Sequence, residues 1–301
     1  MAVNHPKTRT HEGVLLALLA AALWGLTPVA TKGALAGFSP ESLGFVRLAL
    51  STALFRLLAG KDGRWFAGDI WIWLAGIGLG ADFLLYNYGM QRTSANAAGL
   101  VVNIELISTI ALAVWLLGER FNSRRVLGSA ITLAGVLVVT LDGLNLSDLS
   151  GRQRTVGNLL VMAAAVSWSL FAVAQRRTTY GRKLFQRLTP IFSVATIVSA
   201  PVMLRKGVWI ISGGLRPIVM FIVLTLFGTC LVYWVYARAQ ELIDVSVLAI
   251  LLCSIPVFTL LFAYVLLDER VTARLLIGGA VIVAGIVLIS TERQEDCSGA
   301  L

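Results

Sequence analysis

Hydrophobic residues along this chain gather into ten long runs that carry almost no charge, separated by short polar connections. About 20 consecutive apolar residues let an α-helix cross the hydrocarbon core of a bilayer. The pattern therefore predicts ten transmembrane helices, at Gly13–Thr31, Ser42–Ala59, Ile70–Met90, Ala95–Leu117, Val126–Leu141, Thr155–Gln175, Thr189–Leu204, Pro217–Ala237, Val245–Leu267 and Leu275–Ser290.

The composition favours a membrane protein and excludes several other classes. Hydrophobic residues make up 57% of the chain, only 14% is charged, and the mean hydropathy is +0.83. An ordinary soluble domain is about 25% charged, so a water-soluble enzyme and a disordered chain are excluded. The 3 cysteines lack a metal or disulfide spacing, and both histidines lie in the N-terminal tail. We therefore expect no metal site, no cofactor and no catalytic residue.

The basic residues indicate an orientation in the membrane. A net charge of +9 is compatible with nucleic-acid binding, but the Lys and Arg residues lie between apolar runs, which favours membrane topology and no nucleic-acid partner. They are more frequent on the side that also holds both termini. Because Lys and Arg concentrate in cytoplasmic loops, both termini are predicted to be cytoplasmic.

The two halves of the chain resemble each other. Leu117–Arg120 corresponds to Leu267–Arg270, and Tyr86 corresponds to Tyr236 at the same offset. Each half has five predicted spans, so the second half must enter the membrane upside down. Inverted repeats are common in secondary transporters, whose substrate site lies between the repeats. Both Glu-Arg motifs stand where one helix ends and the next begins, so their acidic groups are expected to favour the N-terminus of the following helix.

The repeat predicts a division of the chain into two bundles and three polar segments. The predicted parts are an N-terminal tail 1–12, a first five-helix repeat 13–141, a connecting loop 142–156, a second five-helix repeat 157–290 and a C-terminal tail 291–301.

Ten spans in two halves, each closing with Gly-Glu-Arg or Asp-Glu-Arg before a glycine-bearing last helix, resemble the drug/metabolite transporter superfamily, EamA family. The resemblance covers about residues 13–290 and, within the superfamily, is closest to the YddG-type bacterial exporters of aromatic and other amino acids. It implies a secondary transporter of the bacterial inner membrane that exports small organic solutes by alternating access. One departure concerns a proline that members often carry midway along the last-but-one helix of each half. Pro256 has this place in the second half, but Leu106 occupies it in the first.

Polar and aromatic side chains recur on single helix faces at spacings of three and four residues. A polar group facing lipid costs several kcal/mol, so these faces are expected to turn inward and line a central cavity. The alternative is hydrogen bonding between helices, worth about 0.6 kcal/mol each. The predicted substrate-binding residues are Trp24, Thr27, Tyr86, Asn103, Trp168, Gln175, Tyr233 and Tyr236.

Three charged residues and two prolines lie inside predicted spans. A charge at a helix centre costs about 2.5–3.5 kcal/mol, so such residues are functional candidates. Glu105 and Asp82 are candidates for proton coupling or for binding a substrate ammonium group; alternatively, Glu105 pairs with Arg47. Pro28 and Pro256 remove a backbone donor and are predicted to kink their helices, either for gating or for packing.

Three rival functions remain. The first is an intramembrane aspartyl protease, because Gly78-Leu-Gly80-Ala-Asp82 approaches a Gly-x-Gly-Asp element; it is one residue too long and lacks a second mid-span aspartate. A passive channel is a stronger rival, and an exporter of drugs or other amphipathic metabolites fits the same fold. Gly76, Gly78 and Gly80 are predicted to form a helix-packing surface. The transport direction, the coupling ion and the oligomeric state stay open, with a monomer as the simplest case.

Overall fold

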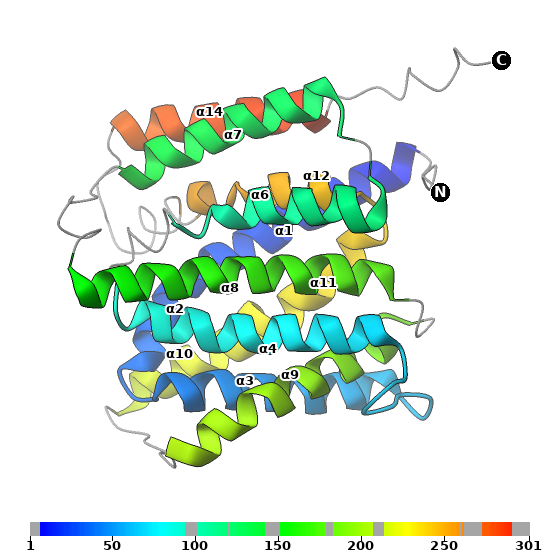
Figure 1. The fold of residues 1–301 in the computed structure, drawn as a ribbon, viewed down its shortest axis with the longest axis vertical. Coiled ribbons are helices and arrows are strands. Elements are labelled where there is room, and N and C mark those ends of the chain that lie inside the picture. Colours follow the sequence, from blue (N-terminus) through cyan, green and yellow to red (C-terminus); the bar gives the residue numbers. More distant parts are fainter. Residues whose placement is uncertain are drawn as a thin grey trace.

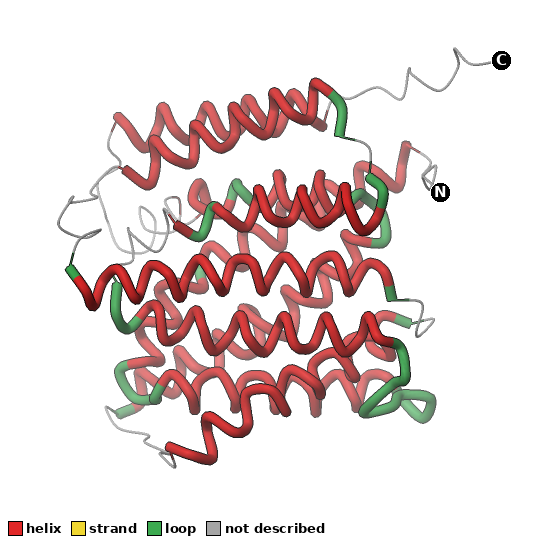
Figure 2. The backbone as a smooth tube through the Cα atoms, viewed as in Figure 1, coloured by secondary structure: helices red, strands yellow, loops and turns green. Residues whose placement is uncertain are grey.

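The computed structural model describes residues 7–93, 101–119, 121–141, 151–178, 183–206, 214–258, 261 and 273–290. Within these ranges the regular structure is helical, without strands, as Figure 2 shows. The elements are α1 (Lys7–Gly25), α2 (Thr27–Leu35), α3 (Pro40–Ala59), α4 (Ile70–Met90), α6 (Ile104–Leu112), η1 (Ala113–Leu117), α7 (Ser123–Leu141), α8 (Arg152–Arg177), α9 (Leu184–Lys206), α10 (Leu215–Thr225), η3 (Leu226–Leu231), α11 (Val232–Gln240), α12 (Val245–Leu252) and α14 (Ala273–Ser290).

Several of the described helices have the length and the apolar composition of membrane spans. By length and composition, five of them suffice to cross a bilayer: Pro40–Ala59, Ile70–Met90, Arg152–Arg177, Leu184–Arg205 and Leu215–Gln240. Large apolar side chains such as Leu57 and Trp115 are mostly exposed, as expected for faces that contact lipid. The chain is therefore an all-helical, multi-pass membrane protein.

Two helices begin earlier than the apolar pattern indicates. Helix α1 begins at Lys7, inside the predicted N-terminal tail, and α8 begins at Arg152, inside the predicted connecting loop. The pattern marks only the part of a helix that needs an apolar environment, whereas a helix continues through polar turns until a residue ends it. Before α8 this residue is Gly151, whose φ of 93° suits glycine.

The packing of the helices is symmetrical under exchange of the two halves. Helix α1 packs against α11 and α8 packs against α4, and these two pairs correspond to each other. Each of the pairs α3 with α9, α6 with α12, and α7 with α14 joins one helix to its own counterpart. Figure 1 shows that α1 and α8 begin at opposite ends of the bundle, and that α14 ends where α1 begins. This is the arrangement that an inverted repeat requires.

Three predicted spans are interrupted. Helices α1 and α2 are separated by a turn at Leu26, and Pro28 lies in the first turn of α2, where its missing N–H is harmless. A turn at Val102 and Asn103 precedes α6, and a turn at Cys253 and Ser254 ends α12 just before Pro256. The fourth span is therefore broken even though Leu106 replaces the proline. There, Glu105 N–H bonds to the carbonyl of Val102 and closes a tight turn.

Glycines allow three close helix contacts, two of them on the surface of α4 that the sequence predicts for packing. On α4, a Cβ at Gly76 or Gly80 would meet backbone oxygens of α9, and one at Gly78 would meet the backbone of α8. Gly135 of α7 and Gly278 of α14 place each helix backbone against the other. Helices α7 and α14 form a pair at one edge of the bundle (Figure 1).

We expect Gly135→Ala to destabilise the protein by about 1–3 kcal/mol, since overpacking of a tight contact has this cost. Its Cβ would lie 2.7 Å from the backbone nitrogen of Ile282 and 2.8 Å from the carbonyl oxygen of Gly278. Gly279→Ala is the matched control, because its Cβ would meet only a side-chain atom of Val257, at 3.8 Å. Thermal unfolding in detergent measures both; equal melting temperatures would contradict a tight α7–α14 contact.

Candidate functional site

Four aromatic residues predicted to bind substrate come together from three helices and both halves of the chain. Trp24 of α1 lies 5.1 Å from Trp168 of α8, measured between ring centroids. Tyr233 of α11 lies 5.7 Å from each tryptophan, and Tyr236 lies 5.5 Å from each. Such tilted and edge-on contacts are the favoured geometries of aromatic pairs. We call these four residues the central aromatic cluster.

Phenylalanines surround this cluster, and sequence reasoning missed two of them, Phe83 and Phe192. Phe171 contacts Trp168, Phe192 of α9 lies 5.1 Å from Tyr233, and Phe83 of α4 lies 6.3 Å from Tyr233. A polar group on an aromatic ring indicates an inward-facing position, whereas phenylalanine is common on lipid-facing positions and gives no such signal. Aromatic contacts around the cluster therefore extend from α1 across the bundle to α9.

Gln175 lies at one end of the central aromatic cluster and contributes to a hydrogen-bonded chain. Its Nε2 donates to Oε1 of Gln240 at 2.8 Å. Gln240 Nε2 in turn donates to the Tyr236 hydroxyl oxygen at 3.0 Å and to the carbonyl of Ala172 at 2.9 Å. The two glutamines thus orient Tyr236 and join α8 to α11.

Arg47 is buried, with 6% of its surface exposed, but it does not pair with Glu105. Its Nε and Nη2 donate to Oγ1 of Thr229 at 3.1 and 2.8 Å, and Nη2 lies 3.5 Å from the carbonyl oxygen of Gly228. Both partners belong to the π-helical segment η3, and such segments occur often at functional sites. The guanidinium also lies over the ring of Phe83, 4.8 Å from its centroid.

The acidic candidates lie close enough to Arg47 and the aromatic rings to interact electrostatically. Asp82 acts on Arg47, Tyr86 and Glu105, and all three of Asp82, Tyr86 and Glu105 are half-buried. Glu105 lies close to the Trp168 side chain. Among the described residues, Asp82 forms no ion pair and accepts no hydrogen bond.

Hydrogen bonds around Ser169 place Glu105 beside Trp168. Ser108 and Thr109 of α6 lie within hydrogen-bonding distance of the Ser169 hydroxyl, at 2.7 and 2.8 Å. Ser169 in turn lies 3.3 Å from the carbonyl oxygen of Glu105. These contacts hold α6 against α8, one residue from Trp168.

Two further candidates, Thr27 and Asn103, lie next to interrupted parts of their helices. The hydroxyl of Thr27 is buried, has no hydrogen-bond partner in the described part of the chain, and faces Gly228 of η3. Asn103 is half-buried in the turn before α6. The Asp268-Glu269-Arg270 motif lies outside the described residues.

The structure corrects the prediction that Glu119 favours the N-terminus of the helix that follows it. Glu119 does not cap this helix, α7. Its carboxylate instead accepts hydrogen bonds from the backbone N–H groups of Val245 and Ser246, at 2.8 and 2.9 Å, and from the Ser246 hydroxyl. It therefore caps α12 of the other half. The loop before α7 brings Glu119 to α12 because α6 and α12 are neighbours in the bundle.

Further polar contacts join the halves at the same end of the bundle, where α1 begins and α14 ends. Arg125 pairs with Asp244 at 2.9 Å, and Thr178 donates to Asp69 at 2.5 Å. Together with the Glu119 cap, we call them the terminus-side contacts.

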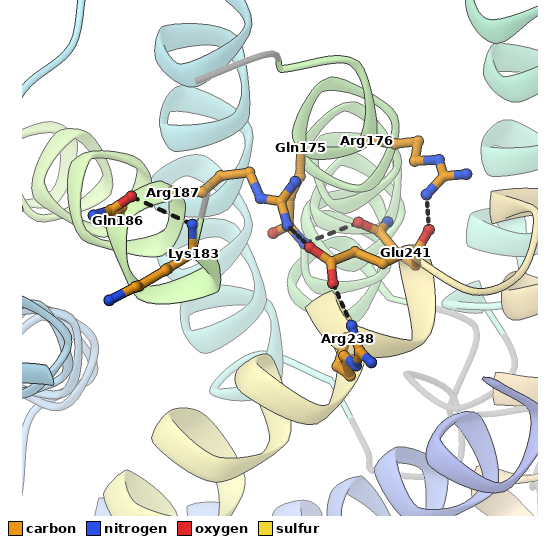
Figure 3. Close-up of polar contacts among 8 residues, drawn as sticks. Gln175, Arg176, Lys183, Gln186, Arg187, Arg238 and Glu241 are labelled. Atoms are coloured by element: carbon orange, nitrogen blue, oxygen red, sulfur yellow. Dashed lines mark hydrogen bonds and ion pairs between the residues drawn. The ribbon is translucent and has the colours of Figure 1, made fainter. Parts of the chain in front are cut away.

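A basic group surrounds Glu241 at this end, as Figure 3 shows. Glu241 pairs with Arg187 of α9 and with Arg238, the latter at 2.9 Å. Arg176 of α8 donates to the carbonyl of Gln240. Arg187 and Arg238 thus share the carboxylate of Glu241, and Arg238 also pairs with Glu12 at 3.4 Å.

No group of His, Cys, Asp or Glu among the described residues is arranged to hold a metal ion. The site consists of aromatic rings, amides and three ionisable side chains inside a helical bundle. This set suits the binding of an amphipathic solute.

The chain is similar to known transporters over nearly its whole length. The sequence profile of the EamA-like transporter family matches residues 11–141 and 155–291. A "Probable amino-acid metabolite efflux pump" of Escherichia coli (strain K12) is 28% identical over 298 residues, 92% of this chain and 94% of that protein. A "Probable terminal-alkyne amino-acid exporter" of Streptantibioticus cattleyicolor is 26% identical, covering 93% of both proteins.

A solved structure described as "Crystal structure of protein" superposes with a TM-score of 0.79, covering 93% of this chain and 96% of that one. At 22% sequence identity, this likeness concerns the fold alone.

Proposed function

Since this chain belongs to the EamA-like transporter family and is a membrane transporter, not an enzyme, we propose that it exports amino acids, aromatic ones and others, as YddG-type exporters do. The observation that carries the proposal is the central aromatic cluster, which is built from both halves and lies next to Arg47, Asp82 and Glu105. Rings with polar tips suit an amphipathic metabolite. Two relatives whose names refer to amino-acid export support the same substrate class.

Alternating access between the repeats is the proposed mechanism. The repeats at 13–141 and 157–290 rock against each other around the aromatic cluster. The terminus-side contacts hold one end closed, and the interruptions next to Pro28 and Pro256 are the proposed hinges.

The proposed orientation places both termini in the cytoplasm of a bacterial cell, with the protein in the inner membrane. The basic group around Glu241 supports this, since it lies at the end of the bundle where α1 begins and α14 ends (Figures 1 and 3). Basic residues gather on the cytoplasmic side of membrane proteins.

A counterflow panel in proteoliposomes tests the proposed function. Liposomes loaded with unlabelled aromatic amino acids, other amino acids, nucleosides or quaternary amines receive a labelled trace of the same compound. We expect saturable uptake for aromatic and other amino acids, and none in liposomes without protein. Exchange of quaternary amines alone would favour a drug exporter, and flux that does not saturate would favour a channel. Either result would overturn the proposal.

Proton coupling through Glu105 gives a separate prediction. We expect Glu105→Gln to abolish the stimulation of transport by a pH gradient while counterflow persists, because the amide cannot take up a proton next to Trp168. Glu12→Gln is the control, since Glu12 is an exposed residue paired at 3.4 Å with Arg238. Uptake with and without an imposed gradient measures the effect; unchanged stimulation in Glu105→Gln would exclude this role.

A further inference from the structure

We propose that the site recognises the zwitterion of an α-amino acid: Arg47 binds its carboxylate and Asp82 binds its ammonium group. The proposal rests on the proposed function and defines which chemical group of the substrate selects it. It assigns a role to each of two buried or half-buried side chains, Arg47 and Asp82, whose hydrogen-bonding groups are not all used in the described chain.

The guanidinium of Arg47 has donors left for a ligand. It carries five N–H donors, and in the described chain its hydrogen-bond partners are Thr229 Oγ1 and, at 3.5 Å, the carbonyl of Gly228. The Nη1 group has no partner among the described residues, although only 6% of the surface of Arg47 is exposed. A buried cation is retained when a counter-charge or a ligand is available. A planar guanidinium matches a carboxylate, which accepts two parallel hydrogen bonds.

The surroundings hold this guanidinium in one orientation. Thr229 is itself fixed, since its hydroxyl donates to the carbonyl of Leu224 at 3.1 Å within the π-helical segment. On the other side, the ring of Phe83 lies 4.8 Å from the guanidinium carbon. Phe83 also contacts Tyr233, so the cation adjoins the central aromatic cluster. An α-carboxylate at Arg47 would place a neighbouring side chain near those rings.

Asp82 provides a carboxyl group that would carry the matching negative charge when an ammonium group lies against it. It precedes Phe83 on α4, it is half-buried, and its charge acts on Arg47. The two residues nevertheless form no ion pair, and Asp82 has no hydrogen-bond partner in the described chain. The carboxylate and the ammonium group of a ligand would supply the partners that Arg47 and Asp82 lack in the described chain. A zwitterion satisfies both charges at once and adds no net charge to the bundle.

The same argument predicts what the site rejects. An ester lacks the carboxylate and would leave Arg47 without a counter-charge, while an N-acetylated amino acid lacks the ammonium group and would leave Asp82 unpaired. Sites that hydrogen-bond a substrate group reject analogues without that group by large factors, because the polar groups of the site are left unsatisfied. We expect discrimination of at least about 100-fold against each analogue.

Counterflow with three probes tests the proposal: L-phenylalanine, its methyl ester and N-acetyl-L-phenylalanine. The wild-type protein should exchange phenylalanine and neither analogue. Arg47→Gln should lose most phenylalanine exchange and the discrimination against the ester, whereas Asp82→Asn should lose the discrimination against the N-acetyl compound. Arg56→Gln is the matched control on the same helix, since Arg56 donates to the carbonyl of Gly60 and stacks on Trp65, away from the cluster.

Ligand-induced thermal stabilisation in detergent provides a readout that does not require transport. Phenylalanine should raise the melting temperature of the wild type and of Arg56→Gln, but not that of Arg47→Gln. If Arg47→Gln fails to fold, Arg47→Lys keeps the charge, loses the planar fork, and should bind phenylalanine at least about 10-fold more weakly.

The two proposals fail in different ways. Equal exchange of phenylalanine and its methyl ester by the wild type would overturn zwitterion recognition and leave amino-acid export intact. The same holds if Arg47→Gln, or Arg47→Lys in its place, retains wild-type binding. Absence of exchange for every amino acid would overturn the proposed function itself.

Discussion

Replacing Trp168 by alanine should abolish counterflow and lower stability by about 3–5 kcal/mol, the usual cost of removing a buried aromatic side chain. Trp168 is 8% exposed and contacts Trp24, Tyr233 and Tyr236 from two other helices. Its loss would also remove the side chain that lies beside Glu105. Counterflow per folded molecule and thermal unfolding in detergent measure the two effects.

Phe55→Ala separates a role in binding from a role in packing. Phe55 is 1% exposed and packs on Phe192 and Phe185, at centroid distances of 4.9 and 5.9 Å, outside the central aromatic cluster. We expect a comparable loss of stability but near-normal counterflow for the molecules that fold. Equal losses of counterflow in Phe55→Ala and Trp168→Ala would assign the cluster to packing alone.

The second large effect is expected from Glu119→Ala, which should open the terminus-side end of the bundle. The substitution leaves the backbone N–H groups of Val245 and Ser246 without their acceptor. Loss of a helix cap costs about 0.5–2 kcal/mol. Because Glu119 belongs to one half and α12 to the other, the proposed alternating access predicts that this cost falls on the state in which this end is closed.

A cysteine at Leu242 reports on this opening. Leu242 is 4% exposed and lies against Gly13 of α1. With the three native cysteines replaced by serine, Leu242→Cys should react several-fold faster with a membrane-impermeant maleimide in the Glu119→Ala background. Glu119→Gln, which keeps one acceptor oxygen, should give an intermediate rate, and Glu12→Ala should give the wild-type rate. An unchanged rate in Glu119→Ala would contradict a closing role for this contact.

The spans could be recognised in the amino-acid order because the requirement for them is local. Any segment that crosses hydrocarbon needs about 20 apolar residues, whatever its neighbours are. Ile70–Met90 was predicted with the bounds that α4 has. The aromatic stripes were recognisable for a similar reason, since helical spacing decides which side chains share a face. The ends of α1 and α8 were not, because polar turns extend a helix without an apolar signal.

Partners that are distant in the chain were beyond sequence reasoning. Arg47 meets Thr229 of the opposite half, where sequence reasoning offered Glu105, and Glu119 caps α12, where it offered the adjacent helix. Composition and periodicity indicate that a buried charged side chain needs a hydrogen-bonding partner. They do not indicate which of the several suitable groups in the chain is that partner.

The amino-acid order alone was therefore sufficient for the helical class, the repeat and the inward-facing residues, because each follows from the bilayer or from helix geometry within one segment. Which charges and rings meet was settled only when the two halves packed together, because a contact between distant residues depends on which helices become neighbours.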